Sequence, residues 1–277
     1  MRYDPTFART GERPRAMEVI IRPTEKDAAE LTARYIANAI RTRPKMVLGL
    51  ATGRTMESVY GRLVDMHKNE SLDFSLVETF NLDEYIGLAP EDPHSYRHYM
   101  NHHLFKHVNI DLRNTHLPVG NAPDITAECE RYETAIRECG GIRLQLLGIG
   151  RSGHIGFNEP LSAMFSRTRA KALTPATIEQ NSPLFDKPGD MPHRAITMGV
   201  GTILESKECL LLAVGEEKAD VIAKAVEGPV TSMISASALQ LHPNCHVIVD
   251  EAAAAKLQNK EYYRWIFNNE PEWESYR

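Results

Sequence analysis

The sequence predicts an α/β protein with a doubly wound, mostly parallel sheet and helices on both faces, a Rossmann-like fold. Short and nearly continuous apolar runs, such as residues 46–50 and 209–214, alternate with longer segments of helical periodicity. Strands that are buried on both faces consist of such runs, and their alternation with helices favours parallel pairing. The 277 residues, 42% of them hydrophobic, can bury one large core. We therefore expect a single domain over residues 17–277, preceded by a flexible N-terminal arm at residues 1–16.

The individual elements can be predicted in order from the same two patterns. Residues 17–21 form an apolar run that predicts the first strand, and Thr24 is placed to cap a helix with Asp27 in its first turn. Further apolar runs predict strands at residues 46–50, 76–80, 142–149, 195–198, 209–214 and 246–249. Helical periodicity predicts helices after residue 55 and at residues 94–107, 124–139 and 216–227.

The composition argues against several classes of partner. The formal net charge of -5 gives a weakly acidic surface, which disfavours nucleic acid or an anionic membrane. No apolar run approaches the ~20 residues that span a bilayer, and the N-terminus lacks the apolar core of a secretory signal. The four cysteines are scattered and form no C-x-x-C pair, as is typical of proteins in reducing compartments. We therefore expect a cytoplasmic protein that binds a small molecule, with no nucleic-acid or membrane partner.

The loop after the predicted strand at residues 46–50 is a candidate phosphate site. It contains Thr52, Gly53, Arg54 and Thr55 and leads directly into a helix, whose first N–H groups can bind an anion. A nucleotide-binding P-loop needs a longer spacing and a lysine where Arg54 stands, so a single phosphate fits better. The alternative is a plain strand-to-helix turn in which Thr52 only caps the helix.

Ionisable side chains follow two other predicted strands. Asp83 and Glu84 come after the strand at residues 76–80, and an ionised carboxylate there can act as a general base. A solvated acidic turn is the alternative for this pair. Lys218 lies near the start of the helix at residues 216–227, where a cation opposes the helix dipole unless an anion is close. A simply solvated lysine is the alternative there.

The strand at residues 142–149 is followed by the pattern G-x-G-x-x-G, so a dinucleotide site must be tested. Gly156 and Pro160 prevent a helix from opening at the third glycine, and the acidic residue expected ~20 positions later is absent. The loop instead presents His154, which can shuttle protons near neutral pH, and Glu159, which can orient the imidazole ring. A structural loop with a packed histidine is the alternative.

A histidine-rich segment at residues 94–107 resembles a metal site only superficially. His94, His98 and His102 repeat at a spacing that places them on one helix face. The segment lacks the glutamate of a zinc protease motif and a clear third ligand. We therefore expect a polar helix face and no bound metal.

Several segments, in a fixed order along the chain, resemble the glucosamine-6-phosphate deaminases. They are residues 80–85 (FNLDEY), 148–160 (GIGRSGHIGFNEP), 166–169 (SRTR), 199–202 (GVGT), 225–228 (AVEG) and 239–243 (LQLHP). The similarity extends from about residue 17 to about residue 266. That family has a doubly wound α/β fold, uses no organic cofactor and often forms hexamers. The resemblance thus implies a cofactor-free homo-oligomer that converts glucosamine 6-phosphate and water to fructose 6-phosphate and ammonia.

The resemblance also implies roles for individual residues. Asp83 matches the base that moves the C2 proton to C1 after the sugar ring opens. His154 matches the histidine that opens the ring, and Glu159 matches the carboxylate that supports this histidine. The residues that match the family's phosphate contacts are Thr52, Gly53, Thr55 and Lys218.

Three features depart from the family pattern. Ser152 stands where the family has an aspartate before the Gly-His pair, which leaves Glu159 as the only nearby acidic partner of the histidine. Pro183 stands where a substrate-contacting arginine is found, and the phosphate loop reads ATGRTM in place of PTGGTP. We hypothesise that Arg54 or Arg151 supplies the anion contact in place of the missing arginine, because a guanidinium group is well shaped for phosphate.

Three alternatives fit the same residues. They are a deaminase or isomerase of another hexosamine phosphate, such as galactosamine 6-phosphate, a lactonase-type hydrolase of related fold, and a non-catalytic sugar-phosphate sensor. A sensor that regulates transcription would need a DNA-binding segment, for which the N-terminal arm is too short. Some related deaminases are activated by an acetylated amino sugar phosphate, and Ser162, Arg169 and Lys171 match that effector pocket.

Overall fold

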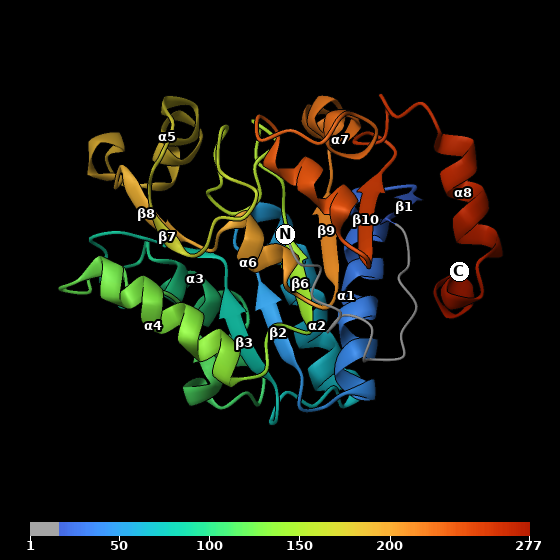
Figure 1. Cartoon of the computed structure of the whole chain (residues 1–277). Coiled ribbons are helices and arrows are strands. Elements are labelled where there is room, and N and C mark those ends of the chain that lie inside the picture. The colour runs from blue at the N-terminus through green and yellow to red at the C-terminus, as the bar shows by residue number, and fades with distance from the viewer. Residues whose placement is uncertain (1–16) are drawn as a thin grey trace, which may run out of the picture.

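The computed structural model describes residues 17–277, so the predicted N-terminal arm lies outside the described residues. The central sheet has seven strands in the order β1-β10-β9-β6-β2-β3-β5, and every neighbouring pair is parallel (Figure 1). These strands are β1 (Met17–Arg22), β2 (Val47–Leu50), β3 (Glu78–Asn81), β5 (Thr115–His116), β6 (Leu144–Leu147), β9 (Cys209–Ala213) and β10 (Cys245–Asp250). The parallel sheet predicted from the apolar runs is confirmed.

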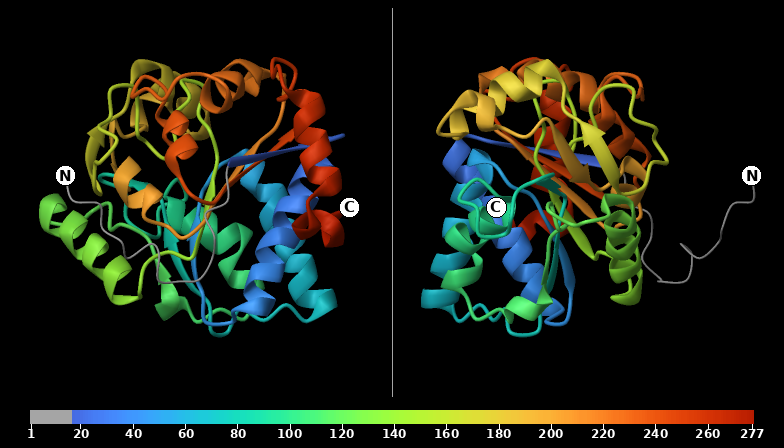
Figure 2. Two further views of the ribbon diagram at one scale, coloured as in Figure 1. Left: turned by 45° about the vertical axis from the view of Figure 1, so that its right-hand side comes forward. Right: turned by 90° about the vertical axis from the view of Figure 1, so that its left-hand side faces the viewer.

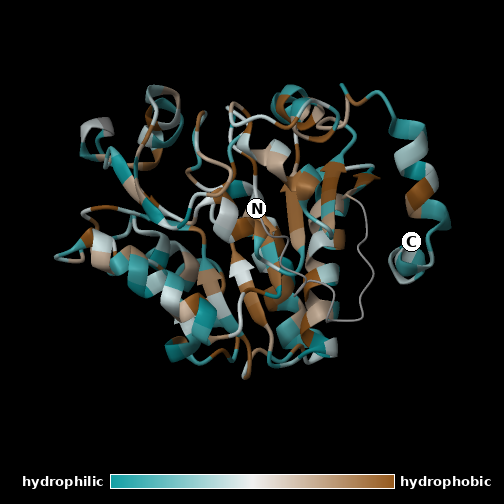
Figure 3. Cartoon of the chain, in the orientation of Figure 1, coloured by the Kyte–Doolittle hydropathy of each residue, from teal (hydrophilic) through white to brown (hydrophobic). Residues whose placement is uncertain are grey.

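Helices cover both faces of this sheet. The helices α1 (Glu25–Thr42) and α2 (Arg54–Glu70) lie side by side on one face, and α4 (Ile125–Glu138) lies on the other (Figure 1 and Figure 2). Thr24 caps α1 by accepting a hydrogen bond from the N–H of Asp27 at 3.2 Å, as predicted. The strands are largely hydrophobic (Figure 3), because both of their faces are covered. The doubly wound arrangement is therefore confirmed.

A second, smaller sheet stands beside the first. Its three strands have the order β4-β8-β7 and pair antiparallel. They are β4 (Asp83–Tyr85), β7 (Arg169–Ala172) and β8 (Arg194–Thr197). The apolar run at residues 195–198, expected to belong to the parallel sheet, forms most of β8 instead. A small apolar cluster that includes Tyr85, Phe157 and Phe185 packs against this sheet, and the last three residues of β8 are buried.

The predicted helix over residues 94–107 is shorter in the structure. The helix α3 (Tyr96–His103) begins after Ser95, whose hydroxyl caps it by accepting a hydrogen bond from the N–H of His98 at 3.0 Å. His94 precedes this cap, so the helical histidine spacing is interrupted. The other α-helices are α5 (Pro175–Asn181), α6 (Val200–Leu204), α7 (Ala219–Val226) and α8 (Lys260–Asn269). Within residues 17–277, no helix is long and apolar enough to cross a membrane.

The order of the strands marks the place where a ligand is expected. From β2 the sheet grows through β3 to β5, and the chain then returns to the other side of β2 to add β6, β9 and β10. In open α/β sheets, ligands bind beyond the carboxyl ends of the strands at such a reversal. The reversal lies between β2 and β6. The two loops that follow these strands contain the candidate phosphate site and His154.

Candidate active site

The loop after β2 turns directly into α2. The helix begins at Arg54, its N-cap residue is Gly53, and no side chain among the described residues caps it. Gly53 has φ of 119° and ψ of 160°, a conformation that glycine adopts without strain. Thr52 is therefore not the helix cap, which argues against the plain-turn interpretation of this loop. The first N–H groups of α2 are left for another acceptor.

Cationic side chains from three strand-end loops lie close together. Arg54 follows β2, Arg151 follows β6, and Lys218 ends the 3-10 turn Glu216–Lys218 that follows β9. Burial lowers the pKa of Lys218, the carboxylate of Glu217 opposes this effect, and the positive charges of Arg151 and Arg54 lower the pKa further. These contributions, smaller than that of burial, place both guanidinium groups within electrostatic range of Lys218. An anion bound among these three cations would relieve their mutual repulsion.

The adjacent carboxylates Asp83 and Glu84 have different surroundings, because successive side chains of a strand point to opposite faces. Glu84 accepts hydrogen bonds from the N–H groups of Tyr96 and Arg97, each at 3.0 Å, and thereby caps the first turn of α3. Asp83 is 6% exposed. Burial raises the pKa of Asp83 to about 8, with a contribution from the charge of Glu84. Burial also raises the pKa of Glu84, to about 7, but both of its carboxylate oxygens are engaged by backbone N–H groups.

Asp83 faces the glycine-rich loop that follows β6. It lies opposite Thr197 in the small sheet, and the Thr197 hydroxyl accepts a hydrogen bond from the N–H of Phe157 at 3.0 Å. A methyl group added at Gly156 would lie 3.5 Å from Asp83 Oδ2 and 2.9 Å from Thr197 Oγ1. Glycine at this position keeps the space beside the Asp83 carboxylate open.

His154 is held in the same loop by two polar neighbours. Its Nδ1 atom lies 2.7 Å from Ser152 Oγ and 3.2 Å from Glu159 Oε2, and these two oxygens are 3.4 Å apart. Ser152 therefore bridges the histidine and the glutamate at the position where the resemblance places an aspartate. The Nε2 atom lies against Gly150, where an added methyl group would come within 2.1 Å of it. The glycine thus allows the ring to lie close to the backbone.

The other oxygen of Glu159 is held by α5. Glu159 Oε1 accepts hydrogen bonds from Thr177 Oγ1 at 2.5 Å and from Thr174 Oγ1 at 3.1 Å, at the start of this helix. Burial by itself raises the pKa of Glu159, but the hydrogen bond and charge of His154, together with the Thr177 hydroxyl, lower the pKa to about 2. Glu159 is therefore ionised at neutral pH, and its Oε2 atom lies 3.2 Å from the ring nitrogen of His154.

Sequence reasoning missed the threonines that hold these groups. Thr174 and Thr177 bind Glu159, and Thr197 binds the loop after β6. Threonine hydroxyls form no recognisable motif, and these contacts join segments far apart in the sequence. No pattern in the sequence could have identified them.

The sequence also singled out Pro183 and three residues that match an effector pocket, Ser162, Arg169 and Lys171. Pro183 is located in the 3-10 turn that follows α5. Of the residues that match an effector pocket, Arg169 and Lys171 are two positions apart on β7, so they share one face of the strand. Arg169 donates a hydrogen bond to Asn158 Oδ1 at 2.9 Å, and Ser162 is buried.

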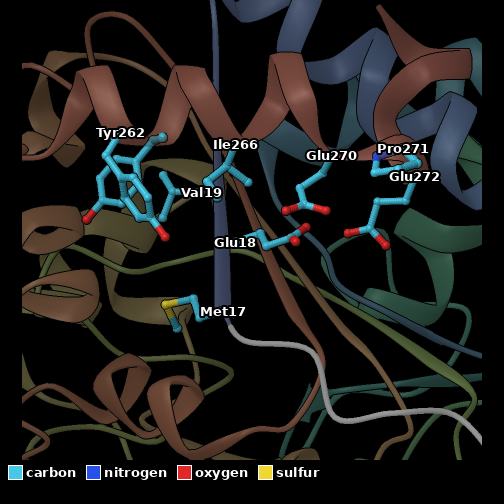
Figure 4. Close-up of a pocket in the computed structure, with 9 residues that line it drawn as sticks. Met17, Glu18, Val19, Tyr262, Ile266, Glu270, Pro271 and Glu272 are labelled. Carbon is cyan, nitrogen blue, oxygen red and sulfur yellow. The ribbon is translucent and has the colours of Figure 1, made fainter.

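Two further features lie apart from the strand-end loops or bear on metal binding. Among residues 17–277, no group of three or more His, Cys, Asp or Glu side chains is arranged to hold a metal ion. A hollow of about 560 Å³ lies at the β1 edge of the sheet, beside α8 (Figure 4). Its lining includes Glu18, Glu270, Glu272 and Tyr262 and none of the predicted site residues. The hollow borders β1, an edge strand that lies three positions from β6 in the sheet. It is therefore separate from the loops after β2, β6 and β9, which contain predicted site residues.

Comparisons with known sequences identify the family. The family model described as glucosamine-6-phosphate isomerases/6-phosphogluconolactonase matches residues 23–248. A glucosamine-6-phosphate deaminase of Shewanella loihica is 51% identical over 250 residues, which cover 90% of this chain and 93% of that protein. A glucosamine-6-phosphate deaminase of Streptomyces coelicolor is 46% identical over 261 residues, which cover 93% of this chain and 99% of that protein.

Solved structures agree with this assignment. A monomeric glucosamine-6-phosphate deaminase has a TM-score of 0.85 at 43% identity and covers 87% of this chain and 100% of its own. A 6-phosphogluconolactonase from Leishmania guyanensis has a TM-score of 0.66 at 18% identity, with 87% and 98% covered, which shows a shared fold alone. The chain therefore belongs, as its motifs predicted, to the glucosamine-6-phosphate isomerase and 6-phosphogluconolactonase family of enzymes, as a relative of the glucosamine-6-phosphate deaminases.

Proposed function

We propose that this protein converts glucosamine 6-phosphate and water to fructose 6-phosphate and ammonia. The observation that carries the proposal is the position of Asp83, a buried carboxyl with a raised pKa that faces the loop of His154. Relatives named for this activity share 51% and 46% of their residues with the chain over nine-tenths of its length. The geometry supports a role for each predicted residue, beginning with the phosphate.

The substrate phosphate would bind at the N-terminus of α2. There it meets free N–H groups, the positive end of the helix dipole and the nearby cations. Arg54 and Arg151 both lie within electrostatic range of Lys218. This supports the hypothesis that one of them contacts the phosphate in place of the family arginine whose position is taken by Pro183. The proposed phosphate contacts are Thr52, Gly53, Arg54, Thr55, Arg151 and Lys218.

His154 would open the sugar ring. Its Nε2 atom accepts the proton of the C1 hydroxyl and returns it to the ring oxygen as the bond between C1 and that oxygen breaks. Glu159 is ionised and stabilises the imidazolium that forms, while Ser152 and Glu159 fix the ring orientation through Nδ1. The product of this step is the open-chain aldehyde.

Asp83 would then move a proton between neighbouring carbons. Its carboxylate takes the proton from C2 while the aldehyde oxygen takes a proton from the substrate's own ammonium group, giving an enolamine. The Asp83 carboxyl then returns its proton to C1, giving a protonated imine at C2. Water hydrolyses the imine to the ketone and releases ammonia. With a pKa raised to about 8, Asp83 can both accept and return a proton near neutral pH. The amino group of the substrate itself leaves, so these steps require no organic cofactor.

A substrate panel read by ammonia release tests the proposal. We expect ammonia from glucosamine 6-phosphate, and a decrease of at least about 100-fold in kcat for Asp83→Asn, the scale of general base catalysis. Asp65→Asn, on the exposed face of α2, is the matched control and should keep full activity. Turnover of galactosamine 6-phosphate alone would replace the substrate assignment. Hydrolysis of 6-phosphogluconolactone without ammonia release would replace the reaction class.

The remaining sequence-based expectations are proposed on the same basis. We propose that residues 17–277 act as one domain, that the enzyme is a cytoplasmic homo-oligomer, and that it requires no metal. The central sheet supports the single domain, because its strands come from residues 17 through 250 and interleave in the sheet order.

A further inference from the structure

Two tyrosine hydroxyls hold the backbone of the loop after β2. The hydroxyl of Tyr99, on α3, donates a hydrogen bond to the carbonyl oxygen of Gly53 at 2.8 Å. The hydroxyl of Tyr60, on α2, donates to the carbonyl oxygen of Ala51. The two rings pack edge to face with centroids 6.5 Å apart. The loop carbonyls are therefore held from two different helices.

These two hydrogen bonds, together with the one that the Gly53 carbonyl accepts from the N–H of Met56 at 2.9 Å, constrain where the neighbouring N–H groups point. In a trans peptide, the C=O of one residue and the N–H of the next point in opposite directions, and the described residues contain no cis peptide bond. With the carbonyls of Ala51 and Gly53 turned toward the tyrosines, the N–H groups of Thr52 and Arg54 turn away from them. The N–H of Arg54 belongs to the first residue of α2 and has no acceptor within the helix.

We infer that Tyr60 and Tyr99 are positioning residues for phosphate binding: they keep the Thr52 and Arg54 N–H groups presented as donors. This inference rests on the proposed function, because it assumes that the loop binds the substrate phosphate. Gly53 gives the loop unusual freedom, and a rotated peptide would aim a carbonyl oxygen at the phosphate in place of an N–H. The tyrosine hydroxyls oppose that rotation.

The two tyrosine hydrogen bonds to the loop after β2, called here the anchor, also connect this loop to the strand that contains Asp83, the proposed base. Glu84 caps the helix that carries Tyr99, and it is the immediate neighbour of Asp83 in β4. A shift of α3 would therefore move the support of the phosphate loop and the strand of the base together. Tyr60 is fully buried, whereas Tyr99 is partly exposed, so Tyr99 is the better position to vary.

The test removes each hydroxyl and keeps the ring. Removal of a neutral hydrogen bond corresponds to about 1 kcal/mol, so we expect Tyr99→Phe and Tyr60→Phe each to raise KM for the sugar phosphate about fivefold, with kcat changed less than about twofold. The Kd for inorganic phosphate, measured by calorimetry in the full-length protein, should rise by the same factor. Tyr263→Phe is the control, because its hydroxyl donates at 2.8 Å to Glu227, away from the loop.

The phosphate measurement separates this inference from the proposed reaction. If the protein releases no ammonia but Tyr99→Phe still weakens phosphate binding, the anchor stands and the reaction is reassigned. If Lys218→Ala weakens phosphate binding while both tyrosine variants bind phosphate like the wild type, the anchor is overturned. The same holds if the tyrosine variants lower kcat alone, or if Tyr263→Phe raises KM equally.

Discussion

Asp83 occupies an environment that disfavours its own negative charge. It is buried beside a second carboxyl, and its pKa is raised to about 8. Ionising this residue therefore costs folding free energy, which a neutral side chain of the same shape would not cost. A general base works best when its pKa lies near the working pH, so the same burial that destabilises the charge suits the proposed proton transfer.

Because the charge on Asp83 is unfavourable in the folded protein, we predict that Asp83→Asn becomes more stabilising as the pH rises. The folded-state pKa of Asp83 lies above its unfolded value of ~3.9, so its stability contribution is fully present below pH ~4 and is lost as the pH rises through about 8. Asparagine does not titrate. We expect the Tm of Asp83→Asn to exceed that of the wild type by an amount that grows from pH 5 to pH 8 and then levels off, with each 1 kcal/mol giving roughly 2–4 °C.

The control for this measurement is Asp65→Asn, at an exposed position. Its Tm should follow that of the wild type across the same pH range. A difference between Asp83→Asn and the wild type that does not vary with pH would show that Asp83 does not titrate in this range in the folded protein.

Ser152 shows how one residue adjusts the proposed ring-opening step. Its hydroxyl lies 2.7 Å from His154 Nδ1, so Ser152→Ala removes one neutral hydrogen bond and should lower kcat about fivefold with little change in KM. Ser152→Asp places a carboxylate beside Nδ1 that can accept a hydrogen bond from the ring in place of the hydroxyl. We therefore expect this variant to keep kcat within about twofold of the wild type. Full activity in Ser152→Ala, or a kcat in Ser152→Asp as low as in Ser152→Ala, would contradict a role through the histidine.

At the scale of elements, a strand can be predicted from the sequence most readily when its side chains are buried on both faces of the sheet. The strands β2 and β9 are buried throughout, so their apolar runs indicate them. By contrast, β7 reads Arg-Ala-Lys-Ala and β4 has three residues, two of them acidic. These segments are strands because they pair with β8. Such pairing is set by tertiary contacts between distant segments, and no local pattern contains it.

The candidate site was likewise predictable in part: its loops could be located from the sequence, but some of its contacts could not. Its loops could be located because parallel strands bring their carboxyl ends to one edge of the sheet. The resemblance to the deaminases implied Asp83, but strand and helix patterns alone could not decide which of Asp83 and Glu84 faces the site, because that choice depends on β4 and on the start of α3 at Tyr96. The contact between Glu159 and Thr177 could not be predicted either, because it joins α5 to the loop after β6, 18 residues apart in the sequence.

At the scale of the whole molecule, one surface loop exposes large apolar side chains, and a hydrogen bond holds its backbone. Leu161 and Phe165, in the loop before β7, are 74% and 76% exposed. Leu161 has φ of 70°, an uncommon conformation for leucine, and its N–H donates to the carbonyl oxygen of Ser232 at 2.9 Å. This bond brings the loop beside Met233, which is 51% exposed. Large apolar side chains exposed on one short loop are typical of contact surfaces between proteins.

We predict that this region forms a contact between copies of the chain. One compared deaminase is monomeric, so membership of the family does not decide assembly, and the surface of each chain must. Sedimentation velocity over a wide range of protein concentration should show an oligomer for the wild type. The double variant Leu161→Glu, Phe165→Glu should shift it toward monomer, because two charges would be buried at the contact without partners. Leu76→Glu, at an exposed site before β3, should leave assembly unchanged. A wild type that is monomeric at every concentration, or a double variant that remains assembled, would contradict the prediction.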